Sequence, residues 1–222
     1  MRGSSASRMR LPPLKLLLAA FIVFLGAFLL YSPVLLLPNI YDTLLHIRIN
    51  DGLTFANVWL PTDAFGFYRP FTFAPIPLVR ALFDSYPAWL LNLLNITHHA
   101  VDAALLIWLI QRLTGKYLPA ILAGILFAIF PFSYQAVAVY GHNVHPQLVT
   151  VLLVNLHQLI SVISTKTLPK KKGPSSSAVG LLIVFVIGLL THESYVLFGP
   201  FAFTSEQQVL RSKHGPVIQS AK

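Results

Sequence analysis

Side chains that could do acid–base chemistry or bind an anion gather in four short segments of the chain. They are Asp42 and His46 in YDTLLHIRI, Arg69 in YRP, His142 and His145 in YGHNVHP, and Glu193 in HES. Asp42 and His46 are four residues apart, which places them on one face of a helix. A carboxylate beside an imidazole orients the ring and raises its basicity, so this pair is a candidate general base. A helix-capping Asp with a His at the level of the lipid headgroups is the alternative interpretation.

Arg69 and the later polar residues are candidates for binding an ion. The planar fork of Arg69 suits a phosphate because it gives two parallel hydrogen bonds, although an Arg near lipid also extends to headgroups. His142 and His145 could ligate a metal with a third ligand, but their spacing is weak evidence and we predict no metal site. Glu193 could bind a cation or orient a base, or it could pair with His192 or an Arg.

A stripe of polar residues lies within an otherwise apolar run. Asn92, Asn95, His99 and Asp102 are separated by three, four and three residues, which places them on one helical face. This face must contact protein or a polar cavity, because polar groups are costly in lipid. We interpret it as structural hydrogen bonding between helices, with a proton relay or a substrate-contacting row as the alternative. Asp102 needs a partner or a proton.

The elements that position these residues are membrane helices. The chain has 222 residues, of which 55% are hydrophobic and 10% charged, whereas a soluble domain is about 25% charged. Runs of about 20 apolar residues predict an all-α, polytopic helical bundle with about five transmembrane helices. These spans are expected at about 14–37, 88–113, 117–139, 145–164 and 178–198.

The loop 38–87 is expected on the outer side of the membrane. Its apolar segment Phe71–Phe83 contains Pro75, Pro77 and Arg80, so it cannot form a regular lipid-exposed span and should be re-entrant or interfacial, packed on protein. The four segments named above then fall near the outer interface. The remaining parts are a basic cytoplasmic N-terminus (1–13) and a polar C-terminal tail (201–222).

The distribution of Lys and Arg predicts the orientation. Ten such residues lie on one side: Arg2, Arg8, Arg10, Lys15, Arg112, Lys116, Lys166, Lys170, Lys171 and Lys172. Three lie on the other, namely Arg48, Arg69 and Arg80. The positive-inside rule therefore predicts a cytoplasmic N-terminus, and the formal net charge of +9 reflects topology and anionic lipid, not nucleic-acid binding. We expect a multi-pass protein of the bacterial cytoplasmic membrane.

Four elements in this order resemble the N-terminal half of GT-C superfamily membrane glycosyltransferases. The similar group is the tetratricopeptide-linked relatives of the protein O-mannosyltransferases. The matching elements are Asp42 with YRPF (68–71); Asn95, His99 and Asp102 followed by QRLTGK; LFAIFPFSYQAVAVY (126–140); and HESYVLFGP (192–200). The resemblance covers roughly residues 14 to 200.

The resemblance implies glycosyl transfer from a polyprenyl-phosphate sugar to an extracytoplasmic acceptor. Asp42, His46 and Glu193 would be catalytic, while Arg69, His142 and His145 would bind the donor phosphate. No cofactor is implied beyond the lipid-linked substrate, and the partners are membrane lipids. The alternative is a non-catalytic accessory subunit of a larger respiratory or photosynthetic complex. Gln135 in place of the family's Glu, and a length that suggests a truncated or degenerate chain, favour that alternative.

Overall fold

The computed structural model describes residues 13–61, 68–131, 133–165 and 176–213. Within these ranges all regular structure is helical and there is no strand. The α-helices are α1 Leu14–Tyr31, α2 Asp42–Asn50, α3 Pro70–Phe73, α4 Pro75–Phe83, α5 Ala88–Thr114, α6 Tyr117–Ile129, α7 Ser133–Ala138, α8 Val144–Thr165, α9 Ser176–Thr191 and α10 Phe198–Lys213. The 3₁₀ helices are η1 Ser32–Leu36, η2 Asn57–Trp59, η3 Tyr140–His142 and η4 Glu193–Leu197. Residues 1–12 of the predicted basic N-terminus, together with Lys166 and Lys170 to Lys172, lie outside the described residues.

Three stretches are helical, long and apolar enough to cross a membrane. They are Leu14–Leu36, Ala88–Thr114 and Tyr140–Ser164. At 1.5 Å per residue the 27 residues of α5 reach about 40 Å, which exceeds the apolar thickness of a bilayer. The apolar helices α6 and α9 are shorter. Within the described residues the structure is therefore all-α and compatible with several membrane passes.

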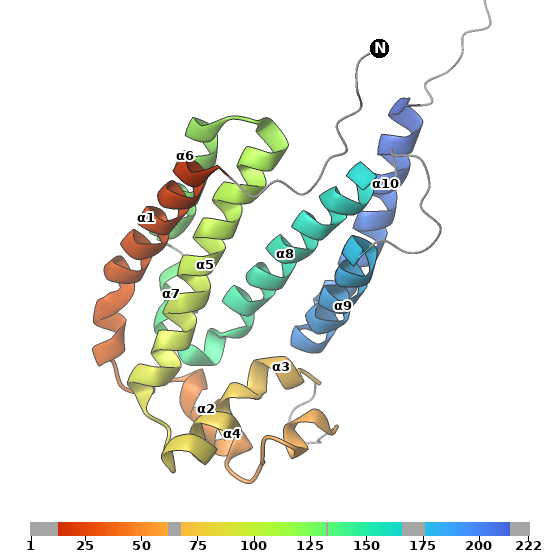
Figure 1. The fold of residues 1–222 in the computed structure, drawn as a ribbon. Helices are drawn as coiled ribbons and strands as arrows, with labels where there is room; N and C mark the ends of the chain where they lie inside the picture. The colour runs from red at the N-terminus through yellow and green to blue at the C-terminus, as the bar shows by residue number, and fades with distance from the viewer. Residues whose placement is uncertain (1–12, 62–67, 132, 166–175, 214–222) are drawn as a thin grey trace, which may run out of the picture.

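Helix α5 is the centre of the bundle. It packs against α1, α6 and α8, and Figure 1 shows it running between them. The small residues Ala100 and Ala103 are fully buried on α5 and pack with Val23 of α1 and Ala120 of α6. Small side chains let helix backbones approach closely, which suits packing in lipid where no hydrophobic force drives helices together.

Neither the third nor the fifth predicted span is one continuous helix in the structure. Pro131 disfavours helical backbone at Phe130, which is extended with ψ 120°, so α6 ends at Ile129 and α7 begins two residues after the proline. Helix α9 ends at Thr191 because His192 is extended, with φ −158° and ψ 133°. The expected polar tail is in part helical, since α10 continues to Lys213.

The segments between α1 and α5 cover one end of the bundle. Figure 1 shows α2, α3 and α4 at the end away from the start of α1 and the end of α8. Phe73, Ile76 and Val79 are buried there against Leu91 and Tyr140. The stretch predicted to be re-entrant or interfacial therefore consists of two short helices packed on protein, and this end carries the polar residues described next.

Candidate functional site

Four segments meet at this end of the bundle and bring the predicted site residues together. Asp42 is the first residue of α2 and His142 the last of η3. Arg69 precedes α3, and Glu193 begins η4. Each side chain thus stands where a helix begins or ends, which is where the chain can turn a polar group away from a packed helical face.

Arg69 and Glu193 form a bidentate ion pair. Arg69 Nε donates to Glu193 Oε2 at 2.8 Å, and Nη2 donates to Oε1 at 2.5 Å. The Arg69 side chain is 16% exposed and that of Glu193 is 61% exposed. The hydrogen bonds from Arg69 lower the pKa of Glu193 to about 2, with further lowering from the charges of Arg69 and His192. An anion could reach the fork of Arg69 only by displacing Glu193.

Asp42 is paired with His142, whereas the four-residue spacing predicted a pair with His46. His142 Nε2 lies 3.0 Å from Asp42 Oδ2. His46 instead packs its ring edge-on against Phe73, with centroids 5.1 Å apart. Burial lowers the pKa of His46, and the charges of His142 and Arg69 lower it further, while Asp42 opposes them. His46 therefore belongs to the same cluster but is a neutral, half-buried neighbour of the Asp42–His142 pair near neutral pH.

Two further histidines complete the site: His145 lies beside His142, and His192 lies beside Glu193. The His145 ring lies 6.1 Å from that of His142, centroid to centroid. His192 Nδ1 accepts from the backbone N–H of Ser194 at 3.1 Å and lies 3.8 Å from Glu193 Oε2. We name the seven residues the outer cluster: Asp42, His46, Arg69, His142, His145, His192 and Glu193. It combines two carboxylates, four imidazoles and one guanidinium, a set that can move a proton and hold an anion at one place.

Residues that sequence reasoning missed position the outer cluster. The Gly141 N–H donates to Thr43 Oγ1 at 2.9 Å, which holds η3 against the start of α2. Thr72 Oγ1 donates to the Thr191 carbonyl at 2.9 Å, next to His192 and Glu193. Asn143 Nδ2 donates in turn to the Thr72 carbonyl at 2.8 Å. Gly141 beside His142 was the one signal in the sequence, because a glycine next to a candidate residue often marks close backbone approach.

The polar stripe on α5 bonds to the ends of neighbouring helices. Asn92 Nδ2 donates to the carbonyls of Val34 and Leu37 around η1. Asn95 Nδ2 donates to those of Ala136 and Val139, where α7 ends.

The deeper members of the stripe make one contact each. His99 Nε2 lies 3.2 Å from the Ala128 carbonyl at the end of α6. Asp102 Oδ1 accepts from Thr150 Oγ1 of α8 at 2.6 Å. Together with the two asparagines, His99 thus contacts backbone carbonyls near the ends of η1, α6 and α7.

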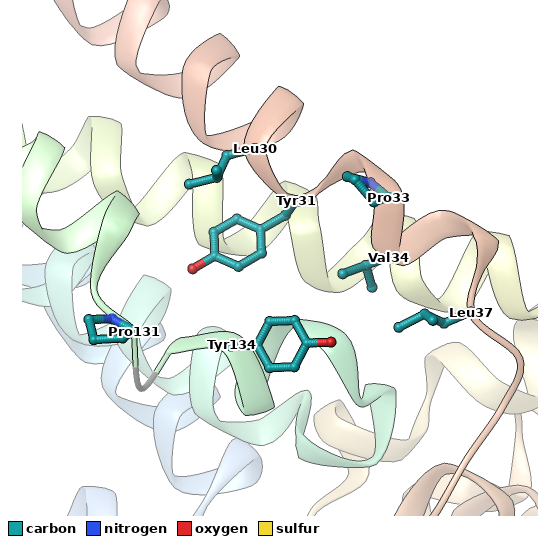
Figure 2. Close-up of a pocket in the computed structure, with 7 residues that line it drawn as sticks. All are labelled: Leu30, Tyr31, Pro33, Val34, Leu37, Pro131 and Tyr134. Carbon is teal, nitrogen blue, oxygen red and sulfur yellow. The ribbon is translucent and has the colours of Figure 1, made fainter.

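A hollow of about 500 Å³ lies apart from the outer cluster. Figure 2 shows it between the end of α1 with η1 and the start of α7, with the rings of Tyr31 and Tyr134 on opposite walls. Pro33, Leu37 and Pro131 complete a mostly apolar lining, and no residue of the outer cluster lines it. Its chemistry suits an apolar chain and not an anion.

Within the described ranges, no group of three or more His, Asp or Glu residues is placed to hold a metal ion. No protein-family model, no curated protein and no solved structure matches the sequence.

Proposed function

We propose that the chain is a GT-C-like integral membrane protein that transfers a sugar from a polyprenyl-phosphate carrier to an extracytoplasmic acceptor. The observation that carries the proposal is the meeting of Asp42, Arg69 and Glu193, from three distant segments, in one cluster with four histidines. The resemblance to GT-C enzymes assigns roles to these same residues. A site of this composition has both a base for the acceptor and a cation for the leaving phosphate.

Sugar transfer at this site would be a direct displacement at the anomeric carbon, with Asp42 as the base. The Asp42 carboxylate takes the proton of the acceptor hydroxyl as its oxygen attacks the anomeric carbon, and the Asp42–His142 contact holds the carboxylate in place. The bond from the anomeric carbon to the phosphate oxygen breaks, and the polyprenyl phosphate leaves with the electron pair. Arg69, with His142 and His145 nearby, would stabilise the departing phosphate once it has displaced Glu193.

The membrane placement is part of the proposal. Five spans and a cytoplasmic N-terminus, in a bacterial cytoplasmic membrane, put the outer cluster on the side where lipid-linked sugars are used. Because the chain has no Cys, single cysteines introduced at Ser85 and at Lys116 report the two sides cleanly. A membrane-impermeant maleimide should label Ser85→Cys in intact cells and Lys116→Cys only after lysis. The reverse pattern would overturn the orientation.

Sugar transfer itself is tested with the purified full chain in proteoliposomes. Radiolabelled polyprenyl-phosphate hexoses are supplied with membrane protein or glycan acceptors, and transfer is counted. Asp42→Asn should abolish transfer while leaving the protein folded. Asp84→Asn, which changes an exposed aspartate at the end of α4, is the matched control and should keep full transfer. Equal transfer by the wild type and Asp42→Asn would refute the role of Asp42.

One observation favours the accessory role as a second candidate. Arg69 is engaged by Glu193, and Asp42 by His142, so the charged groups already have protein partners. Such pairs suit a scaffold that holds its end of the bundle rigid. Recovery with other membrane subunits in fixed stoichiometry under mild detergent, without transfer activity, would favour this role over the enzyme.

A further inference from the structure

Asp102 is an acid inside the bundle that the outer cluster does not use. It lies on α5, within a stretch long enough to cross a membrane, and its exposure is 0%. One carboxyl oxygen, Oδ1, accepts from Thr150 of α8, while Oδ2 has no hydrogen-bond partner. In the part of the chain that the structure describes, no ion pair joins Asp102 to a basic side chain.

An ionised carboxylate in this position would be very costly. Moving an unpaired charge out of water costs far more than moving a neutral acid, so such groups take up a proton or find a counter-ion. The partner of Asp102 is a neutral hydroxyl, which cannot balance a negative charge. The surroundings of Asp102 therefore favour its protonated form.

The Thr150 hydroxyl is shared among three neighbours. Its oxygen lies 2.6 Å from Asp102 Oδ1, 3.0 Å from the Pro146 carbonyl and 3.2 Å from His98 Nδ1. A hydroxyl has one proton to donate and can also accept. The hydroxyl proton can point to Asp102 or to the Pro146 carbonyl, and in the second case a protonated Asp102 can donate to Thr150 Oγ1 across the same 2.6 Å contact. The contact therefore accommodates both the ionised and the protonated form of Asp102.

We propose that Asp102, Thr150 and His98 form a proton-binding site inside the membrane-spanning bundle. The proton rests on Asp102 and exchanges through the Thr150 hydroxyl with His98, which is half-buried and so closer to the surface of the bundle. This site is separate from glycosyl transfer and does not depend on it.

Proton exchange along the hydrogen-bonded series His98, Thr150 and Asp102 conserves atoms and charge. A proton that binds His98 makes an imidazolium with an N–H at both ring nitrogens. His98 Nδ1 then passes its proton to Thr150 Oγ1 as the hydroxyl proton moves to Asp102 Oδ1. The imidazolium and carboxylate become a neutral imidazole and a carboxylic acid, and the reverse steps release the proton.

The other titratable groups near this site have contacts of their own. His99 of α5 is stacked on Phe127 of α6 and lies edge-on to Tyr31 of α1. From α8, His157 Nε2 contacts the Leu105 carbonyl.

Arg112, the arginine of α5, is also engaged elsewhere. Arg112 donates to the His157 carbonyl and to Ser161 Oγ. Among the described residues no charged side chain acts on Asp102, so the local hydrogen-bonded chain through Thr150 is its route to a proton.

Infrared difference spectroscopy on the purified full chain in lipid nanodiscs tests the proposal. At neutral pH the wild type should show the C=O stretch of a protonated carboxyl group, and this band should shift in D₂O. Asp102→Asn, which keeps the shape and neutrality of the acid, should lose the band. The control Asp84→Asn, which removes an exposed carboxyl group, should retain it. Identical carboxyl regions in Asp102→Asn and the wild type would overturn the proposal.

Two further variants test the exchange route and keep the carboxyl group in place. Thr150→Val removes the hydroxyl and should shift the band to higher frequency, whereas Thr150→Ser should restore it. His98→Gln should slow the deuterium exchange of the band severalfold, while Thr97→Ala on the same helical turn should not. A band unmoved in Thr150→Val, or an exchange rate unchanged in His98→Gln, would rule out the proposed chain.

Discussion

His142 and Asp42 are one hundred residues apart in the sequence, and their side chains meet at 3.0 Å. The contact depends on the backbone of η3 lying directly against the first turn of α2. Gly141 makes this possible, because a Cβ atom there would overlap the backbone of Asp42 and Thr43. The pairing in the outer cluster therefore rests on the absence of a side chain at the residue before His142.

Gly141→Ala should destabilise the protein. The added methyl group meets backbone atoms that cannot move aside, and overpacking of this kind costs about 1–3 kcal/mol. We expect a lower thermal midpoint, measured by differential scanning fluorimetry in detergent.

Gly26→Ala is the control for this change. Gly26 lies on α1 and nothing lies within 4 Å of an added Cβ, so this variant should be neutral or slightly more stable. Equal midpoints for Gly141→Ala and Gly26→Ala would contradict the close approach of η3 and α2.

Asn95→Ala should also lower stability. Its amide donates to the carbonyls of Ala136 and Val139 at the end of α7, and the substitution removes both bonds, while the Val139 carbonyl keeps the His142 N–H at 2.9 Å. A buried acceptor left unsatisfied costs about 1–3 kcal/mol. The control is Thr97→Ala, since Thr97 bonds only to the Leu93 carbonyl within its own helix. If the two variants unfold at the same temperature, the asparagine does not hold α7.

The Arg69–Glu193 pair should make stability depend on acidic pH. The pKa of Glu193 falls from its ordinary 4.5 to about 2 in the folded protein. The contribution is therefore complete above about pH 4.5 and is lost as the pH falls toward 2. Glu193 is largely exposed, so solvent screening keeps the effect small.

The measurement is the unfolding midpoint against pH for the wild type and Glu193→Gln. The glutamine keeps the size of the side chain but cannot ionise, so its profile should be flatter between these two values. Parallel profiles would show that the ion pair does not contribute to folding.

His46 should make the folding stability depend on pH in a second range, below pH 6.5. Burial lowers its pKa below the ordinary 6.5, so protonation is easier in the unfolded chain. Stability should therefore fall as the pH drops below 6.5 and be complete above it. His46→Gln should reduce this slope, measured by unfolding at a series of pH values. If stability falls with pH as steeply in His46→Gln as in the wild type, groups other than His46 cause the dependence.

The sequence by itself determined the helical character of the chain and the face on which polar residues gather. Apolar runs specify helices locally, so α5 and α8 begin and end close to the predicted limits, while α1 begins at the predicted residue, ends at Tyr31 and is followed by η1. The spacing of Asn92, Asn95 and His99 specifies one face of α5 for the same reason. The broken third span shows the limit of hydropathy, since Pro131 interrupts the helix without making its surroundings less apolar.

The tertiary structure alone decided which polar residues are partners. Local spacing favoured Asp42 with His46, yet Asp42 meets His142, and Arg69 meets Glu193 from 124 residues away. Such pairs form only when α5 and α8 pack and bring the ends of separate helices together. Contacts between distant segments depend on the packed shape of the whole bundle, and no local pattern in the sequence encodes that shape.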